Sequence, residues 1–255
     1  MSRKRLEGDA AVVTGAASGL DRGIALELAR HGATVACCDV DTDGNEETVR
    51  MIRNAGGEAF SVYMDVTDSK SVKDAMRQAY DRMGKITILI NGAGIVRFSP
   101  IESCSDEEWD IVMQTNITGY FYCLREVYPY MKAGGGGRIV QLSSTSAKSG
   151  SNYGGPHYTA SKGGVISLTK YAARRWCKDN IRVNTICPGI ADTPMGVDPT
   201  APAGSLEKML KDIPMGRICQ PEDIAGGVMF LVTDESRYVT GITLDITGGR
   251  YVYGN

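Results

Sequence analysis

Two side chains in the middle of the chain have the types and spacing of an acid/base pair. Tyr158 and Lys162 are four residues apart, in a segment that reads as the start of a helix. Residues at i and i+4 of a helix lie on one face. An ammonium beside a phenol favours the phenolate, so we expect Lys162 to lower the pKa of Tyr158 from about 10 toward the range of a proton-transfer catalyst. The same spacing occurs by chance on many helices, so the rest of the chain must decide.

A second candidate site is the turn from Thr14 to Asp21, Thr-Gly-Ala-Ala-Ser-Gly-Leu-Asp. It follows the apolar run 10–13, which reads as a buried strand, and precedes residues 20–31, whose apolar positions have helical spacing. The glycines Gly15 and Gly19 therefore fall at a strand-to-helix turn. At such a junction a pyrophosphate can bind the free N–H groups of the helix.

The acidic residue that a dinucleotide site needs is Asp39, which lies at the end of the next strand, 20 residues beyond Gly19. A carboxylate there accepts hydrogen bonds from the two ribose hydroxyls and repels a 2′-phosphate, which favours NAD over NADP. The alternative is that Asp39 begins a solvated turn together with Asp41 and Asp43.

Polar and glycine residues also follow the next two predicted strands. Asp65-Val66 ends one of them, and Asn91-Gly92-Ala93-Gly94 ends the other. Ligands bind at the carboxyl ends of the strands in open α/β sheets, so these residues support a nucleotide site.

The elements that must position these residues alternate along the chain. Beyond 10–13, short apolar strand-like runs at 34–38, 59–64, 86–90, 138–142, 181–187 and 243–246 are separated by amphipathic segments of helical length. This pattern predicts an α/β fold, a doubly wound parallel sheet with helices on both faces. We find no linker, so residues 1–255 are expected to form a single domain, with a proline-rich lid at about 190–214.

Composition excludes several other classes of protein. The 255 residues are 42% hydrophobic and 23% charged, and the net charge of −2 gives no basic field for nucleic acid. No apolar run approaches the roughly 20 residues of a membrane span, and the polar N-terminus has no signal-peptide core, so a cytoplasmic protein is expected. The seven cysteines have no C-x-x-C spacing, which predicts reduced, buried thiols and no metal site.

Taken together, the motifs resemble the short-chain dehydrogenase/reductase family over essentially the whole chain. The matching pieces are Thr14-Gly15-x-x-x-Gly19, Asp65, Asn91-x-Ala93-Gly94, Asn116, Ser143-Ser144, Tyr158-x-x-x-Lys162, Pro188-Gly189 through Thr193, and the segment 241–249. The resemblance implies a Rossmann-type domain that transfers a hydride between a nicotinamide and a carbonyl or hydroxyl carbon.

The resemblance also implies the roles of individual residues. Tyr158 would be the general acid/base, Lys162 would lower its pKa and hold the nicotinamide ribose, and Ser144 would orient the substrate oxygen. Asn116 would support a proton-relay water beside Lys162. The predicted cofactor-binding residues are Gly15, Ser18, Gly19, Leu20, Asp21, Asp39, Asp65, Val66, Asn91, Ala93, Gly94, Tyr158, Lys162, Pro188, Gly189, Ile190 and Thr193.

The expected function is an NAD-dependent oxidoreductase of a secondary alcohol or ketone. Apolar residues in the substrate region, such as Ile95 and Met195, favour an apolar or cyclic substrate such as a hydroxysteroid. The alternatives are a 3-oxoacyl or polyol reductase/dehydrogenase of the same family and a non-catalytic binding protein on the same scaffold.

Family resemblance further suggests a homotetramer or dimer, with the aromatic tail from Tyr251 either frayed or packed on another subunit. His157 is expected to be an exposed loop residue.

One residue departs from the family pattern. Members usually have glycine at the position of Asp21, and aspartate adds a negative charge near an anionic pyrophosphate. At roughly 6 to 8 Å and an effective dielectric constant near 20, the repulsion is about 2 to 3 kcal/mol per charge pair. Either Asp21 weakens cofactor binding or shifts cofactor preference, or its carboxylate turns to solvent with the neighbouring Arg22 to neutralise it.

Overall fold

The computed structural model describes residues 5–150, 154–193, 195 and 210–251. Over these ranges seven strands form one parallel sheet in the order β3-β2-β1-β4-β5-β6-β7. The strands are β1 (Ala10–Thr14), β2 (Thr34–Asp39), β3 (Glu58–Tyr63), β4 (Ile88–Asn91), β5 (Gly137–Leu142), β6 (Ile181–Pro188) and β7 (Thr243–Ile246). The chain leaves β1 in one direction and later returns to its other side with β4. That reversal creates a crevice at the carboxyl ends of β1 and β4.

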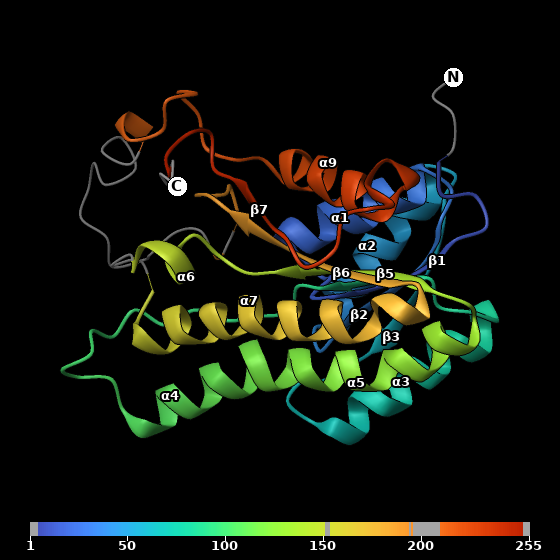
Figure 1. Ribbon diagram of the computed structural model, residues 1–255, viewed down its shortest axis with the longest axis horizontal. Coiled ribbons are helices and arrows are strands. Elements are labelled where there is room, and N and C mark those ends of the chain that lie inside the picture. Colours follow the sequence, from blue (N-terminus) through green and yellow to red (C-terminus); the bar gives the residue numbers. More distant parts are fainter. Residues whose placement is uncertain (1–4, 151–153, 194, 196–209, 252–255) are drawn as a thin grey trace.

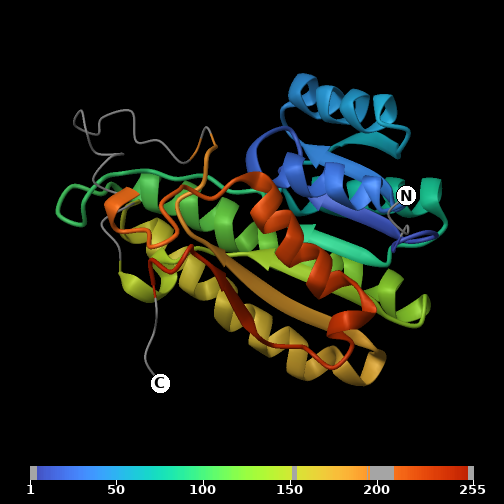
Figure 2. The same ribbon diagram turned by 90° about the horizontal axis from the view of Figure 1, so that it is seen from above.

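Helices cover both faces of the sheet (Figures 1 and 2). One layer contains α1 (Gly19–Arg30), α2 (Thr42–Asn54) and α9 (Pro221–Val232), and the other contains α3 (Ser69–Met83), α4 (Asp106–Met113), α5 (Gly119–Ala133) and α7 (Pro156–Trp176). Shorter pieces are α6 (Ser146–Ser149), the π-helical turn η1 (Gln114–Thr118) and the 3-10 turns η2 (Cys177–Asp179) and η4 (Asp234–Ser236).

Strand β1 shows why two helical layers are needed. All five of its residues are buried. Val13 packs with Ile24 and Leu28 of α1 on one face, whereas Val12 belongs to the apolar cluster of α3 and α5 on the other. Because successive side chains of a strand point to opposite faces, an uninterrupted apolar strand requires cover on both sides. The predicted doubly wound α/β fold is confirmed.

The predicted element boundaries hold to within about two residues. β2 and β6 each run one residue further than expected, and β4 begins at Ile88, two residues later than expected. Most of the predicted lid, residues 194 and 196–209, lies outside the described residues.

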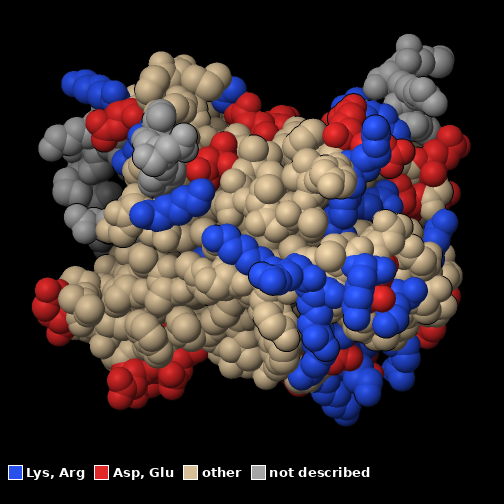
Figure 3. All heavy atoms as spheres, viewed as in Figure 1, with Lys and Arg blue, Asp and Glu red and all other residues tan. Residues whose placement is uncertain are grey.

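The surface carries both signs of charge. On the face in Figure 3, Lys and Arg side chains run across the middle and gather at the lower right, whereas much of the lower left is uncharged. Within the described ranges, none of the helices combines the length and apolar character needed to cross a bilayer. All seven cysteines are free, but Cys177 is exposed, so the expectation of buried thiols is wrong for that residue.

Candidate active site

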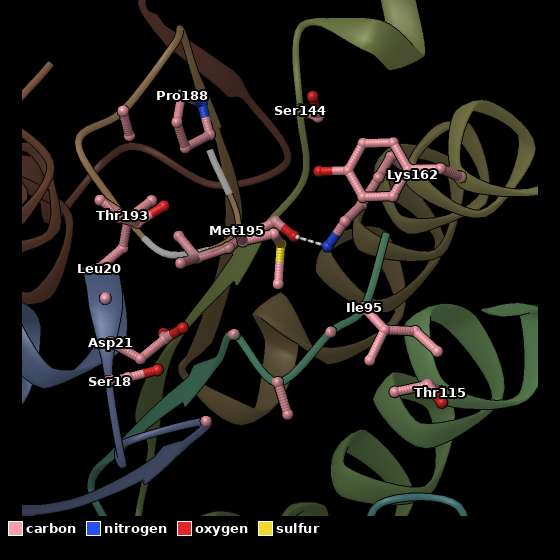
Figure 4. Close-up of a pocket in the computed structure, with 18 of the residues that line it drawn as sticks. Ser18, Leu20, Asp21, Ile95, Thr115, Ser144, Lys162, Pro188, Thr193 and Met195 are labelled. Carbon is pink, nitrogen blue, oxygen red and sulfur yellow. Dashed lines mark hydrogen bonds between the residues drawn. The ribbon is translucent and has the colours of Figure 1, made fainter. Parts of the chain in front are cut away.

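A cavity of about 810 Å³ opens at the carboxyl ends of the strands, where the strand order reverses. Of the predicted site residues, all but Asn91 and Asn116 line it. Figure 4 shows Ser18, Leu20 and Asp21 on one side of this cavity and Ser144 and Lys162 on the other. The fold thus brings together two groups of residues that are more than 120 positions apart in the chain.

The nucleotide loop, residues 15–18, joins β1 to α1. Gly15 and Gly19 have φ angles of +78° and +59°, which favour glycine. A side chain on Gly15 would also meet the Ala93 backbone at 3.0 Å, so the loop lies directly against the end of β4. Ser18 is the N-cap of α1, but its side chain makes no capping hydrogen bond, unlike Asp41 on α2 or Asp68 on α3. The first amides of α1 are therefore available to an anion.

Asp39 is held at the far end of the nucleotide loop. One oxygen accepts a hydrogen bond from the Ala17 amide and the other from the Asp41 amide, both at 3.0 Å. These bonds fix the carboxylate at the rim of the cavity. The solvated-turn alternative accounts for the bond to Asp41 but not for the bond back to the loop.

Asn91 is the predicted cofactor residue that the structure does not bring to the cavity. Its side chain is buried beneath the sheet end, and its amide donates to the Tyr120 carbonyl at 3.2 Å and to Gln141 at 3.3 Å. Asn91 therefore fastens β4 to α5 and β5. Asp65, by contrast, lines the cavity, with Oδ1 accepting from the Thr67 amide and hydroxyl.

Ser144 and Tyr158, the predicted proton-transfer residues, both line the cavity. Burial raises the pKa of Tyr158, and a hydrogen bond with Ser144 opposes that rise. The net direction is therefore upward, opposite to the net lowering expected from the sequence, because burial is the largest influence, and the role of Lys162 in proton transfer stays a prediction. The choice of Ser144 among four consecutive hydroxyl residues also has a structural reason. The neighbouring Ser143 hydroxyl is committed to the Lys162 carbonyl at 2.7 Å.

Lys162 lies behind the tyrosine ring, with Nζ 5.7 Å from the ring centroid. Its ammonium donates to the Leu142 carbonyl at 3.0 Å, a bond drawn in Figure 4, and to the Tyr120 hydroxyl at 3.3 Å. Burial lowers the pKa of Lys162 to about 8, and the nearby Asp21 opposes this. The sequence analysis did not identify Tyr120 as a site residue, because no motif around it indicates a contact with Lys162, 42 positions away.

Asn116 lies in η1 and is fully buried. Its amide group bonds both the N–H and the C=O of Ile95 at 2.8 Å, and donates to the Ser161 hydroxyl at 3.3 Å. A side chain on Gly94 would meet both Asn116 Oδ1, at 3.1 Å, and Lys162 Nζ, at 3.4 Å. Asn116 thus shapes the backbone beside Lys162 without lining the cavity, and its role with a relay water stays a prediction.

The segment after β6 closes the cavity above the nucleotide loop. Gly189 donates to the Ile246 carbonyl at 2.8 Å, and a side chain on Gly19 would touch Thr193 at 3.5 Å. Arg250 and Tyr251 also line the cavity, with the guanidinium 5.1 Å from the ring centroid. Tyr251 therefore lies at the site, whereas residues 252–255 of the aromatic tail lie outside the described residues, and packing on another subunit stays a prediction.

Asp21 does not turn to solvent. Asp21 is only 8% exposed, and it lines the cavity beside Ser18 and Leu20 (Figure 4). Burial raises the pKa of Asp21 well above its usual value, Asp39 adds to the rise, and Lys162 opposes it. Arg22 does not neutralise it, because that guanidinium bonds Thr48 and the carbonyls of Ala17 and Gly44.

His157 is likewise not the exposed loop residue that was expected. It is fully buried at the start of α7, within 4.8 Å of ligand-type atoms of Cys104 and Glu108. Its Nδ1 accepts a hydrogen bond from the Tyr158 amide at 2.8 Å. In a neutral imidazole the other nitrogen then carries the proton and is a donor. The ring as placed offers no free lone pair to a metal ion, so we assign no metal to this group.

The residues present fit a dinucleotide. Uncapped amides face the middle of the cavity, a fixed carboxylate lies at one end, and a Ser-Tyr-Lys group lies at the other. The one feature that an anionic pyrophosphate would not favour is the Asp21 carboxyl group.

Comparison with known proteins agrees with this reading. A family model described as Enoyl-(Acyl carrier protein) reductase matches residues 15–250. A 3-oxoacyl-[acyl-carrier-protein] reductase of Thermotoga maritima is 38% identical over 248 residues, covering 97% of this chain and all of the relative. The chain belongs to the short-chain dehydrogenase/reductase family. Family membership makes it an oxidoreductase of alcohol or ketone substrates that uses a pyridine nucleotide.

Two further relatives of this short-chain dehydrogenase/reductase are relevant to its substrate class and its cofactor. A (3R)-3-hydroxyacyl-CoA dehydrogenase of Canis lupus familiaris is 35% identical over 257 residues, covering 97% of this chain and 98% of the relative. The crystal structure of a 3-ketoacyl-(acyl-carrier-protein) reductase from Brucella melitensis complexed with NADH has a TM-score of 0.90 and 33% identity, covering 97% of this chain and all of that chain.

Proposed function

We propose that this protein is an NADH-dependent reductase of 3-oxoacyl thioesters. The observation that carries the proposal is that Asp39 and the Ser144-Tyr158-Lys162 group line the same cavity. The substrate class comes from the relatives, whose names specify 3-oxoacyl and 3-hydroxyacyl thioesters. This replaces the hydroxysteroid expected from the sequence and favours the alternative given beside it. The expected homo-oligomer stays a prediction.

The chain's own residues supply binding, orientation and a proton. The bound nicotinamide supplies the hydride that the substrate carbonyl carbon accepts. Ser144 donates a hydrogen bond to the substrate oxygen and steadies the negative charge that develops there. Tyr158 then delivers its hydroxyl proton to that oxygen, which leaves a phenolate. Lys162 lies behind the ring and favours the phenolate by its charge.

A substrate panel tests the reaction. We expect loss of reduced-nicotinamide absorbance with acetoacetyl-CoA and 3-oxoacyl carrier-protein thioesters, at a higher kcat/KM than with oxosteroids or with polyols assayed in the oxidative direction. A higher kcat/KM for a steroid or polyol would overturn the substrate assignment. Absence of turnover with every member of the panel would favour the non-catalytic binding protein.

The preference for NADH over NADPH is expected to depend on Asp39. Replacing Asp39 by Ser removes the charge that repels a 2′-phosphate and the bond that fixes the nucleotide loop. We expect the ratio of the NADPH and NADH dissociation constants to fall by about tenfold or more, a change of at least about 1.4 kcal/mol in relative affinity. Fluorescence titration of both cofactors measures it.

Asp43→Ser is the matched control, because Asp43 is an exposed acid in the first turn of α2. An unchanged preference in Asp39→Ser would show that this carboxylate does not select the cofactor.

A further inference from the structure

The buried carboxyl group of Asp21 occupies the space in which a side chain at position 92 would lie. A Cβ added to Gly92 would overlap the Asp21 carboxyl group, and one added to Gly15 would lie 3.2 Å from its Oδ2. The carboxyl group is thus wedged between the ends of β1 and β4, against backbone atoms. Glycine at position 92 is what makes room for aspartate at position 21.

Among the described residues, Lys162 is close enough for its charge to favour the Asp21 carboxylate, but one carboxyl oxygen has no hydrogen-bond donor. Asp21 Oδ1 is buried and accepts no hydrogen bond from any residue that the structure describes. On its own helix, Arg22 is engaged elsewhere. The ammonium of Lys162 on α7 donates to Leu142 and Tyr120 instead.

The other titratable groups around Asp21 do not help an ionised form. Asp39 at the end of β2 acts on Asp21 as a second negative charge. Tyr120 on α5 and Tyr158 on α7 are buried phenols, and the segment 91–94 after β4 contributes no ionisable side chain. An unpaired buried carboxylate is costly, and such a group is stabilised by binding a proton.

Asp21 also lies in the first turn of α1, at the amides that would receive the pyrophosphate. We propose that Asp21 couples dinucleotide binding to the uptake of a proton, so that the cofactor binds the chain whose Asp21 carboxyl group is neutral. The proposal rests on the proposed function, since it requires that a dinucleotide binds in this cavity. Aspartate in place of glycine at position 21 would then make the affinity for the cofactor depend on pH, in addition to changing its magnitude.

Proton linkage gives the direction in which cofactor affinity changes with pH. A nearby diphosphate disfavours the carboxylate, so the complex binds more protons than the free protein at any pH where free Asp21 is partly ionised. Affinity is therefore greatest at low pH and falls as pH rises, by up to about tenfold per pH unit while one proton is taken up. Burial, which raises the pKa of Asp21, moves this fall in affinity to higher pH than an exposed aspartate would give.

Isothermal titration calorimetry tests the coupling. ADP-ribose and NADH are titrated into the protein from about pH 5 to pH 9, in buffers of different ionisation enthalpy, which counts the protons taken up. ADP-ribose keeps the diphosphate and omits the nicotinamide that approaches Lys162. We expect proton uptake and a pH-dependent dissociation constant in the wild type, and loss of both in Asp21→Asn.

The controls separate the possible failures. Asp43→Asn changes an exposed acid in the first turn of α2 that does not line the cavity, so it should behave as the wild type. Asp21→Gly also removes the titrating group and replaces Asp21→Asn if that variant misfolds. Equal proton uptake in the wild type and the Asp21 variants, or pH-independent wild-type binding, would overturn the coupling alone. Absence of ADP-ribose and NADH binding to every variant at every pH would overturn the proposed cofactor as well.

Discussion

Replacing Tyr158 by Phe is expected to lower kcat/KM for the 3-oxoacyl substrate by about 10²- to 10⁴-fold, the range typical of general acid catalysis. The substitution removes one hydroxyl and keeps the ring, which is only 8% exposed and lies over Lys162. The proton for the substrate oxygen then has no donor, whereas the groups that hold the nucleotide are unchanged. Steady-state kinetics with NADH, together with a fluorescence titration of NADH, measures both effects.

Tyr171→Phe is the matched control for this substitution. Tyr171 lies on the same helix, α7, and is 65% exposed, so the loss of its hydroxyl should change neither kcat/KM nor the dissociation constant of NADH. Activity within tenfold of the wild type in Tyr158→Phe would remove Tyr158 from the reaction. A large rise in the NADH dissociation constant would instead give the residue a binding role.

Replacing Gly92 by Ala is expected to lower the free energy of unfolding by about 1 to 3 kcal/mol, because a methyl group there overlaps the Asp21 carboxyl group. Gly92 is not among the glycines with a positive φ, so backbone strain adds nothing to the effect. Combining Gly92→Ala with Asp21→Gly should restore most of the loss, since the second change removes the overlapping atoms. Urea denaturation of the four proteins gives the coupling energy of the pair.

The control for Gly92→Ala is Gly226→Ala on α9, where an added Cβ meets no atom within 4 Å. Alanine is favoured over glycine inside a helix, so this variant should be unchanged or more stable by up to about 1 kcal/mol. If the effects of Gly92→Ala and Asp21→Gly on the free energy of unfolding are additive, the two side chains do not compete for the same space. The Asp21 carboxyl group is then not packed against position 92.

The packing of Asp21 links these experiments to the proposed function. The carboxyl group lies between the nucleotide loop and the end of β4, and its charge is felt by Lys162 and Tyr120. A change at position 21 is therefore expected to affect both the nucleotide loop and the surroundings of Lys162. For this reason Asp21 variants are best compared first by cofactor binding, before their activity is interpreted.

Much of the fold follows from local sequence. The strand β1 is apolar at every position before Thr14, which requires cover on both faces, and the alternation of such runs with helical segments requires a parallel sheet. The placement of Gly15, Gly19, Asp39 and Tyr158 at the carboxyl ends of strands or the start of a helix also follows, because these positions are fixed by the elements that precede or follow them.

The directions of individual side chains depend on contacts between distant segments. Asn91 ends a strand at the site, yet its amide turns inward because Tyr120 and Gln141 offer buried partners. Lys162 shares a helix face with Tyr158, yet its ammonium is held by Leu142 and Tyr120 from other elements. His157 adjoins Tyr158 in sequence, but it is buried close to Cys104 and Glu108.

The sequence by itself determined the order of strands and helices, the dinucleotide loop and the Tyr-Lys pair, because each depends on spacing along a single strand, turn or helix. Only the tertiary structure decided that Asp21 is buried and that Tyr120 joins Lys162. Both outcomes depend on packing between segments that are distant in the chain, because Asp21 lies against Gly92, 71 positions away, and Lys162 bonds Tyr120, 42 positions away.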